Sequence, residues 1–359
     1  MRAHFSVALL LVACSDANVP PGGDGSYRTT LYTSLDEYGM VSLQNGAIVP
    51  NDGVTPYDLN TPLFSDSAVK FRTVWTPGGL SAPYNDSQVL DLPVGTILTK
   101  SFGFRDDLRK AAPAIRWVET RVFVHQDAGW KGVSYRWDEA QQKATIDYAG
   151  GLVPLSWIDE DGNPASTSYV VPNGNQCVQC HNSGSVTTPI GPKVRNLNKS
   201  YTYPGGADNQ LEHWAHEDIL RGAPADPTQA PRLAAWNDPT TGTVAERARA
   251  YLETNCAHCH SEGGFARTTG LFLSASVSKP SQFGVCKPPV AVGEATGGFL
   301  YDVVPGDPDH SILVYRMAST TPSVMMPQIG RSIVDEAGLQ LVRDWITSLK
   351  GTVPDCAGH

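Results

Sequence analysis

The chain has 359 residues, of which 41% are hydrophobic and 18% are charged, a balance typical of a globular protein and not of a disordered one. This length is sufficient for two or more domains, and 34 glycines with 27 prolines predict many turns and short strands. The formal net charge of −9, with no run of basic residues, argues against nucleic acid as a partner.

Residues 1–13 are predicted to be an export signal. A single arginine precedes an apolar run from Phe5 to Ala13, which is too short to span a bilayer but is typical of a signal peptide. The run ends in Leu11-Val12-Ala13-Cys14, which resembles a bacterial lipobox. We therefore expect Cys14 to be lipidated, the alternative being an ordinary signal peptide with an incidental cysteine.

Residues 14–30 are expected to form a flexible tether, because they are polar and rich in Gly and Pro. No other segment is apolar for long enough to be a transmembrane helix. The sequence therefore predicts an exported protein that a lipid anchors to a bacterial membrane, on the periplasmic or cell-surface side.

Residues 31–172 are predicted to form a β-rich domain, either a sandwich or a partly open barrel. β-Branched and aromatic residues concentrate in the segments 94–98, 114–124 and 132–137. Clusters of turn-forming residues, such as residues 159–163, separate these predicted strands.

Two C-x-x-C-H pentapeptides carry the chemistry of the chain, one at residues 177–181 and one at residues 256–260. Two thiols three positions apart can each add to one vinyl group of a haem, and the histidine that follows is then placed under the iron as an axial ligand. We therefore expect two covalently attached c-type haems, held by Cys177, Cys180, His181, Cys256, Cys259 and His260.

Three alternatives compete with this interpretation of the pentapeptides. Two C-x-x-C pairs can build a zinc site, a single pair can be a thioredoxin-like redox motif, and the repetition can be chance. The histidine that follows both pairs favours haem, and so does the export signal, because haem attachment takes place outside the cytoplasm.

The first haem-binding segment is expected to cover residues 173–240. A strand end and a turn precede its motif, and no methionine lies between His181 and Cys256. The distal ligand of the first haem is therefore left open among His213, His216, His125 and Met40. For His213 and His216, which lie on a short predicted helix, two solvated polar residues are the alternative.

Residues 241–359 are predicted to form a helical domain around the second motif. A capping box at Thr243–Glu246 begins a helix that leads to this motif, and Asp335 with Glu336 begins the last helix. The order of helix, haem motif, loop and helix resembles the class I cytochrome c fold. The fold class is thus α+β and multidomain, with a β-rich N-terminal domain followed by mainly helical haem-binding segments.

The class I fold takes its distal ligand from a loop just before the last helix, and here that loop contains Met325-Met326-Pro327. Thioether sulfur is a soft ligand that favours reduced iron and raises the potential. Met326, directly before Pro327, matches the pattern best. Met325 is the neighbouring alternative, and two core-filling methionines are the third.

The chain has seven cysteines, and Cys286 and Cys356 remain once Cys14 and the two motifs are assigned. Because an exported protein meets an oxidising compartment, we predict a disulfide between them. Two separate free thiols are the alternative.

The chain resembles a group of bacterial dihaem c-type cytochromes that join a β-rich N-terminal region to two haem-binding segments. Beside the haem motifs and the C-terminal domain, the resemblance rests on Asn60–Asp66, Trp117–Arg121, Gln176, Asn196–Asn198 and Asn209–Leu211. It implies electron transfer between a redox protein donor and a redox protein acceptor, and it names no substrate.

We therefore expect the protein to be an electron carrier rather than an enzyme. One alternative is a dihaem enzyme such as a peroxidase, in which the first haem lacks a sixth ligand so that peroxide can bind. The other is a haem-bearing docking subunit of a redox complex. The absence of an obvious distal ligand for the first haem keeps the enzyme in consideration.

Overall fold

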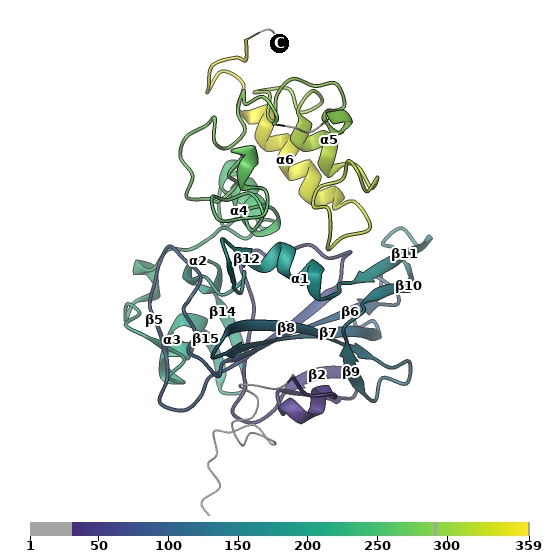
Figure 1. Cartoon of the computed structure of the whole chain (residues 1–359), viewed down its shortest axis with the longest axis vertical. Helices are drawn as coiled ribbons and strands as arrows, with labels where there is room; N and C mark the ends of the chain where they lie inside the picture. Colours follow the sequence, from purple (N-terminus) through teal and green to yellow (C-terminus); the bar gives the residue numbers. More distant parts are fainter. Residues whose placement is uncertain (1–30, 291–292, 358–359) are drawn as a thin grey trace, which may run out of the picture.

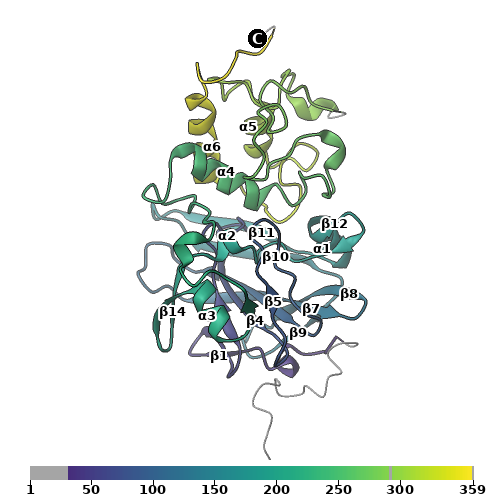
Figure 2. The same ribbon diagram turned by 90° about the vertical axis from the view of Figure 1, so that its left-hand side faces the viewer.

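The computed structural model describes residues 31–290 and 293–357, which form two lobes stacked along the long axis of the molecule (Figure 1). Figure 2 shows the same division from the side, with the strands in one lobe and the longest helices in the other. The predicted export signal, Cys14 and the tether lie outside the described residues. Within the described ranges, no helix has the length and apolar character needed to cross a membrane.

A six-stranded antiparallel sheet in the order β3-β4-β6-β7-β8-β9 is the centre of the first lobe. Its strands are β3 (Thr55–Tyr57), β4 (Val69–Trp75), β6 (Ile97–Arg105), β7 (Ile115–Gln126), β8 (Gly129–Trp137) and β9 (Ala144–Asp147). The β-rich domain is thus confirmed. Because β3 and β9 are the two edges, the sheet is open and not a closed barrel.

The two faces of this sheet have different roles. One face packs against the helical turn η2 (Leu35–Tyr38) and the hairpin of β1 (Val41–Gln44) and β2 (Ala47–Pro50) around buried Val122 and Val124. Side chains alternate along a strand, so the residues between these valines point to the opposite face. That second face is directed toward the other lobe.

A second hairpin leads the chain into the first C-x-x-C-H motif. It consists of β10 (Gly151–Ile158) and β11 (Pro164–Val171), and its inner side packs against buried Phe102 and Phe104 of β6. The smaller elements of this lobe are β5 (Ala82–Pro83), α1 (Gly174–His181), β12 (Asn182–Ser183), β13 (Val186–Thr187), α2 (Val194–Leu197), β14 (Ser200–Tyr203), β15 (Gly206–Asn209), α3 (Gln210–His216), β16 (Leu220–Arg221) and η3 (Pro227–Gln229).

The boundary expected at residue 172 does not separate two cores. One buried cluster joins Leu98 of the sheet to Leu197 of α2 and Trp214 of α3, and β16 pairs in parallel with β5. The Asn60 side chain also donates to the carbonyl of Asn198 at 3.1 Å. Residues 173–240 are therefore packed as part of the first lobe.

The second lobe is built on helices, namely α4 (Val244–Asn255), η4 (Arg267–Thr269), η5 (Gly293–Thr296), α5 (Ile312–Met317) and α6 (Glu336–Ser348). The buried residues of its core run from Ala248 to Ile346. Helices α4 and α6 cross so closely that a Cβ at Gly338 on α6 would lie 2.4 Å from the ring of Tyr251 on α4. Only glycine fits this crossing.

The ends of these helices follow the predicted signals. Thr243 and Glu246 form the capping box of α4, and Asp335 caps α6. The predicted disulfide between Cys286 and Cys356 is present and ties the C-terminal tail to the loop that follows the second motif. The helix caps and the disulfide all lie within residues 241–359, the range expected for the helical domain.

The loop of residues 60–66, in the first lobe, forms hydrogen bonds with the second lobe. The Phe64 amide donates to the side chain of Asn255 at 2.8 Å, and the Ser332 amide donates to the carboxylate of Asp66 at 2.6 Å. This segment, which contributed to the family resemblance, thus holds the second lobe over the second face of the sheet.

Candidate functional site

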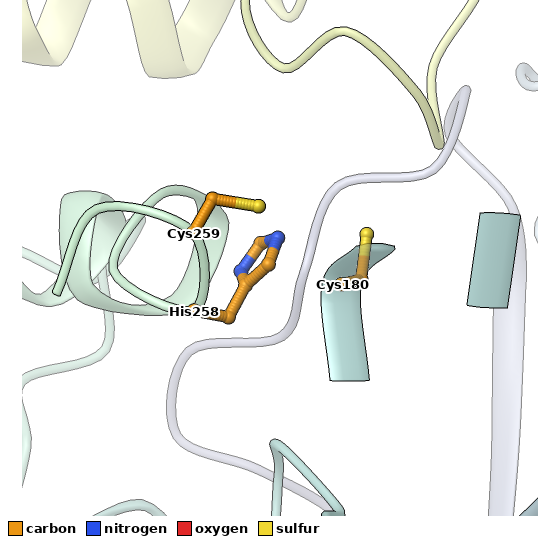
Figure 3. Close-up of side chains that lie close together, drawn as sticks. All are labelled: Cys180, His258 and Cys259. Atoms are coloured by element: carbon orange, nitrogen blue, oxygen red, sulfur yellow. The ribbon is translucent and has the colours of Figure 1, made fainter. Parts of the chain in front are cut away.

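The two C-x-x-C-H motifs, which are far apart in the sequence, converge where the lobes meet. Cys180 lies on α1, and His258 with Cys259 lies just after α4; the ligand atoms of these three side chains all lie within 4.8 Å of one another (Figure 3). The segments that follow the motifs also touch, since the Gly184 amide donates to the Gly263 carbonyl at 2.7 Å.

The first motif is placed by helix α1. Asn173 caps this helix: its side chain accepts from the Gln176 amide, and the Gln176 side chain accepts from the Asn173 amide, both at 3.0 Å. Positions i, i+3 and i+4 of a helix share one side, so Cys177, Cys180 and His181 are presented together.

His181 has the arrangement of an iron ligand. Its Nδ1 lies 2.9 Å from the carbonyl oxygen of Thr188, and a histidine that donates from Nδ1 to a carbonyl keeps Nε2 available for a metal. Burial lowers the pKa of His181 to about 4, so the imidazole is neutral at pH 7. Neutral imidazole is the form that binds iron.

An aromatic side chain fixes the orientation of this ring. Phe123 lies against His181 with ring centroids 4.7 Å apart, and it stacks on Trp130. Phe123 is paired in register with Gly132 on β8, where a Cβ would come within 2.3 Å of the Phe123 ring. Gly132 therefore allows Phe123 to lie flat across the sheet beneath His181.

A cavity that is partly open to solvent extends between the lobes over the second face of the sheet. The attachment residues Cys177, Cys180 and His181 line it from α1, and Cys256 and Met326 line it from the second lobe. Much of the remaining wall is apolar, with Leu59, Leu63, Phe64, Leu98, Phe123, Val170, Ile190 and Ile329. A wide, largely apolar cavity edged by thiols and a neutral imidazole fits covalently attached haem.

The second motif follows the end of α4. Cys256 caps this helix, and the amide of His260 donates to the Cys256 carbonyl at 2.9 Å. Burial lowers the pKa of His260 to about 4, and its buried Nδ1 has no hydrogen-bond partner among the described residues. His260 is thus also a neutral imidazole, although it does not line the cavity that contains His181.

The structure distinguishes the two methionines of the predicted ligand loop. Met326 lines the cavity of His181, which His260 does not line, so the structure does not place Met326 and His260 in the wall of one cavity. Met325 is buried and is not part of this wall. The loop is held by Arg331, whose Nη2 donates to the Met326 carbonyl at 2.9 Å and to the Ser319 carbonyl at 2.7 Å. This role could not be predicted from the sequence, because a single arginine in a loop forms no pattern.

The four residues considered as distal ligand of the first haem lie outside this cavity. Met40 is fully buried in the core on the other face of the sheet. The Nδ1 atom of His125 lies 2.7 Å from the Leu92 carbonyl oxygen, and its ring stacks on Trp130.

The two histidines of α3 are also absent from the cavity wall. His213 stacks on Tyr203 with centroids 3.4 Å apart, and His216 is exposed. Met40, His125 and His213 therefore serve other contacts. Their distance from the wall could not be foreseen, because it depends on how α3 and β7 pack in three dimensions.

Comparison of the chain with protein-family models, with curated proteins and with solved structures finds no match. The resemblance to dihaem cytochromes therefore remains a prediction from the motifs.

Proposed function

We propose that this protein is an exported dihaem c-type cytochrome that transfers electrons between a redox protein donor and acceptor. The convergence of the two motifs carries the proposal, because the sulfurs of Cys180 and Cys259 lie within 4.8 Å. These cysteines bond the vinyl edge of a haem, so two attached haems would be neighbours at their edges. Adjacent haems suit passage of an electron from one to the other.

The haem and the protein would have separate roles in electron transfer. Bound haem supplies reversible one-electron chemistry, and the protein supplies ligands, burial and orientation. His181 and His260 would be the proximal ligands, and Met326 would be the distal ligand opposite His260. Lipidation at Cys14 would hold the protein at the membrane, close to its redox partners.

Removing the first attachment site should lower the haem content from two haems per chain to one. The variant is Cys177→Ser with Cys180→Ser, produced with the export and haem-attachment machinery, and covalent haem is counted by the pyridine haemochrome assay and by mass. The matched control, Cys286→Ser with Cys356→Ser, removes two cysteines outside the motifs and should keep both haems. A wild-type chain without covalent haem would refute the proposal.

Replacing Met326 with alanine should abolish the sulfur-to-iron charge-transfer band of the oxidised protein and lower one of the two midpoint potentials, because a soft ligand is lost. Optical spectra and a redox titration measure both effects. The control is Met325→Ala, which should leave the band in place. Loss of the band in Met325→Ala alone would move the ligand by one residue, and an unchanged band in both variants would contradict the class I interpretation of the second lobe.

A second function is favoured by the cluster itself. Two thiols and an imidazole within 4.8 Å are a donor set that zinc prefers, so Cys180, His258 and Cys259 could hold this ion in a chain without haem. Metal analysis of the purified protein separates the two, since zinc without haem iron would select this alternative. The zinc site leaves His181 and the cavity without a role, which is why we favour the cytochrome.

An enzyme is favoured by one observation, namely that none of the four candidate distal ligands lines the cavity of His181. A first haem with an open sixth position could bind peroxide. A stable five-coordinate haem in the oxidised protein, together with peroxide turnover, would select the peroxidase over the carrier.

A further inference from the structure

A row of three cations crosses the central sheet on the face that lines the cavity. The register pairs Arg72 of β4 with Lys100 of β6, and Lys100 with Arg121 of β7. Directly paired residues on neighbouring strands point to the same side, and all three side chains line the cavity. Like charges placed side by side repel one another, so this row requires negative charge nearby.

Arg72, at one end of the row, is incompletely satisfied. Its side chain is 3% exposed and pairs with Asp58 at 2.9 Å, but its buried Nη2 has no hydrogen-bond partner in the described part of the chain. Asp58 also pairs with Lys199 at 2.9 Å, so its charge is shared between two cations. A buried guanidinium nitrogen without an acceptor is costly, and Arg72 belongs to the wall of the cavity.

In the rest of the row, Arg121 has a carboxylate partner and Lys100 has none among the described residues. Arg121 pairs with fully buried Glu119 at 2.5 Å, whereas no carboxylate among residues 31–290 and 293–357 forms an ion pair with Lys100. Within these ranges Lys100 contacts the ring of Phe102 instead, with its nitrogen 4.7 Å from the centroid. The wall of the cavity therefore holds two donors without a carboxylate partner, namely Lys100 and the Nη2 atom of Arg72. Burial, together with the neighbouring charges of Arg72 and Arg121, lowers the pKa of Lys100, so an anion bound beside it would restore its positive charge.

We propose that Arg72, Lys100 and Arg121 bind carboxylate groups, and that the propionates of the haem attached at Cys177 and Cys180 supply them. This inference rests on the proposed function. Carboxylate suits the donors, because guanidinium and ammonium groups form their strongest hydrogen bonds with anionic oxygens. A porphyrin carries its propionates on the edge opposite the thioether bonds, so the row should extend away from the attachment cysteines.

The order of the cations agrees with this direction. Arg121 lies on β7, the strand whose Phe123 contacts His181 of the first motif with ring centroids 4.7 Å apart. Lys100 lies one strand further and Arg72 two strands further, at spacings of about 5 Å per strand. The row thus runs from the thioether edge toward the edge that bears the carboxylates, with the unsatisfied Arg72 nitrogen at its far end.

The test compares Arg72→Gln and Lys100→Gln with the conservative variant Lys100→Arg and with Lys131→Gln, which removes an exposed cation from the same sheet. Each holoprotein is examined by haem count, resonance Raman spectroscopy of the propionate modes, redox titration, and calorimetric titration with acetate. We expect both neutral variants to shift the propionate mode and to lower one midpoint potential, because an uncompensated carboxylate favours the oxidised iron. Lys100→Arg and Lys131→Gln should match the wild type.

The outcomes separate this proposal from the one on which it rests. Two haems with an unchanged propionate mode in both neutral variants would refute the role of the row and leave the proposed function intact. Saturable acetate binding to the wild-type holoprotein, lost in Lys100→Gln, would also refute it, since a free carboxylate would then be the ligand. A wild-type chain without two haems would refute the proposed function itself.

Discussion

Replacing Glu253 with glutamine should lower the free energy of unfolding by about 3 kcal/mol, because it leaves two partly buried cations without their counter-charge. Glu253 on α4 is 3% exposed, and its Oε1 accepts from Lys193 at 3.1 Å and from Arg195 at 2.6 Å. Its Oε2 accepts from the Ala275 amide at 3.0 Å. This carboxylate joins the second lobe to the segment that follows the first haem motif.

The effect of Glu253→Gln should depend on pH in a defined direction. Burial raises the pKa of Glu253, but Lys193 and Arg195 outweigh burial and the pKa is lowered in the folded protein. A carboxyl with a lowered pKa stabilises the fold above the unfolded-state value of about 4.3, and this contribution is lost as the pH falls. The difference from wild type should therefore be full at pH 7 and shrink below pH 4.

Urea denaturation followed by tryptophan fluorescence measures this difference at each pH. The control is Asp309→Asn, which breaks an ion pair with Arg343 at a side chain that is 72% exposed and should cost less than about 1 kcal/mol. Equal losses in Glu253→Gln and Asp309→Asn would contradict the assignment of the buried carboxylate as an interlobe anchor.

Replacing both Cys286 and Cys356 with serine should lower the free energy of unfolding by about 4 kcal/mol in the chain-entropy account of disulfides. The bond closes a long loop, since its two cysteines are 70 residues apart. The same loss should follow when a thiol reductant is added to the wild type, whereas the reductant should leave the double variant unchanged. Wild-type stability that is insensitive to reductant would contradict the prediction.

Local features of the fold were accessible from the sequence. The caps at Thr243 and Asp335 and the β-branched segment that became β7 each act within a few residues, so composition and spacing suffice to find them. The joining of residues 173–240 to the sheet was not accessible. It depends on a buried cluster that contains both Leu98 and Trp214, which lie far apart in the chain.

In the candidate site, too, some features could be predicted from the sequence and others could not. The two pentapeptides could be found from the sequence alone, because the covalent attachment of haem that we propose requires a fixed spacing of thiols and imidazole. Arg72, Lys100 and Arg121 form a row only through the register of three strands, and no spacing in the sequence reveals that register. Arg331 likewise gains its role from carbonyl groups that folding gathers around it.

The closeness of Cys180 and Cys259 also sets an order for the maturation of the protein. In an oxidising compartment, two thiols within 4.8 Å are ready to cross-link with each other, and a cross-link would consume one attachment sulfur from each motif. If the haems are attached as we propose, the chain must be kept reduced and open until both have been received. Folding of the two lobes against each other would then be the last step of assembly, sealing cofactors that are already bonded in place.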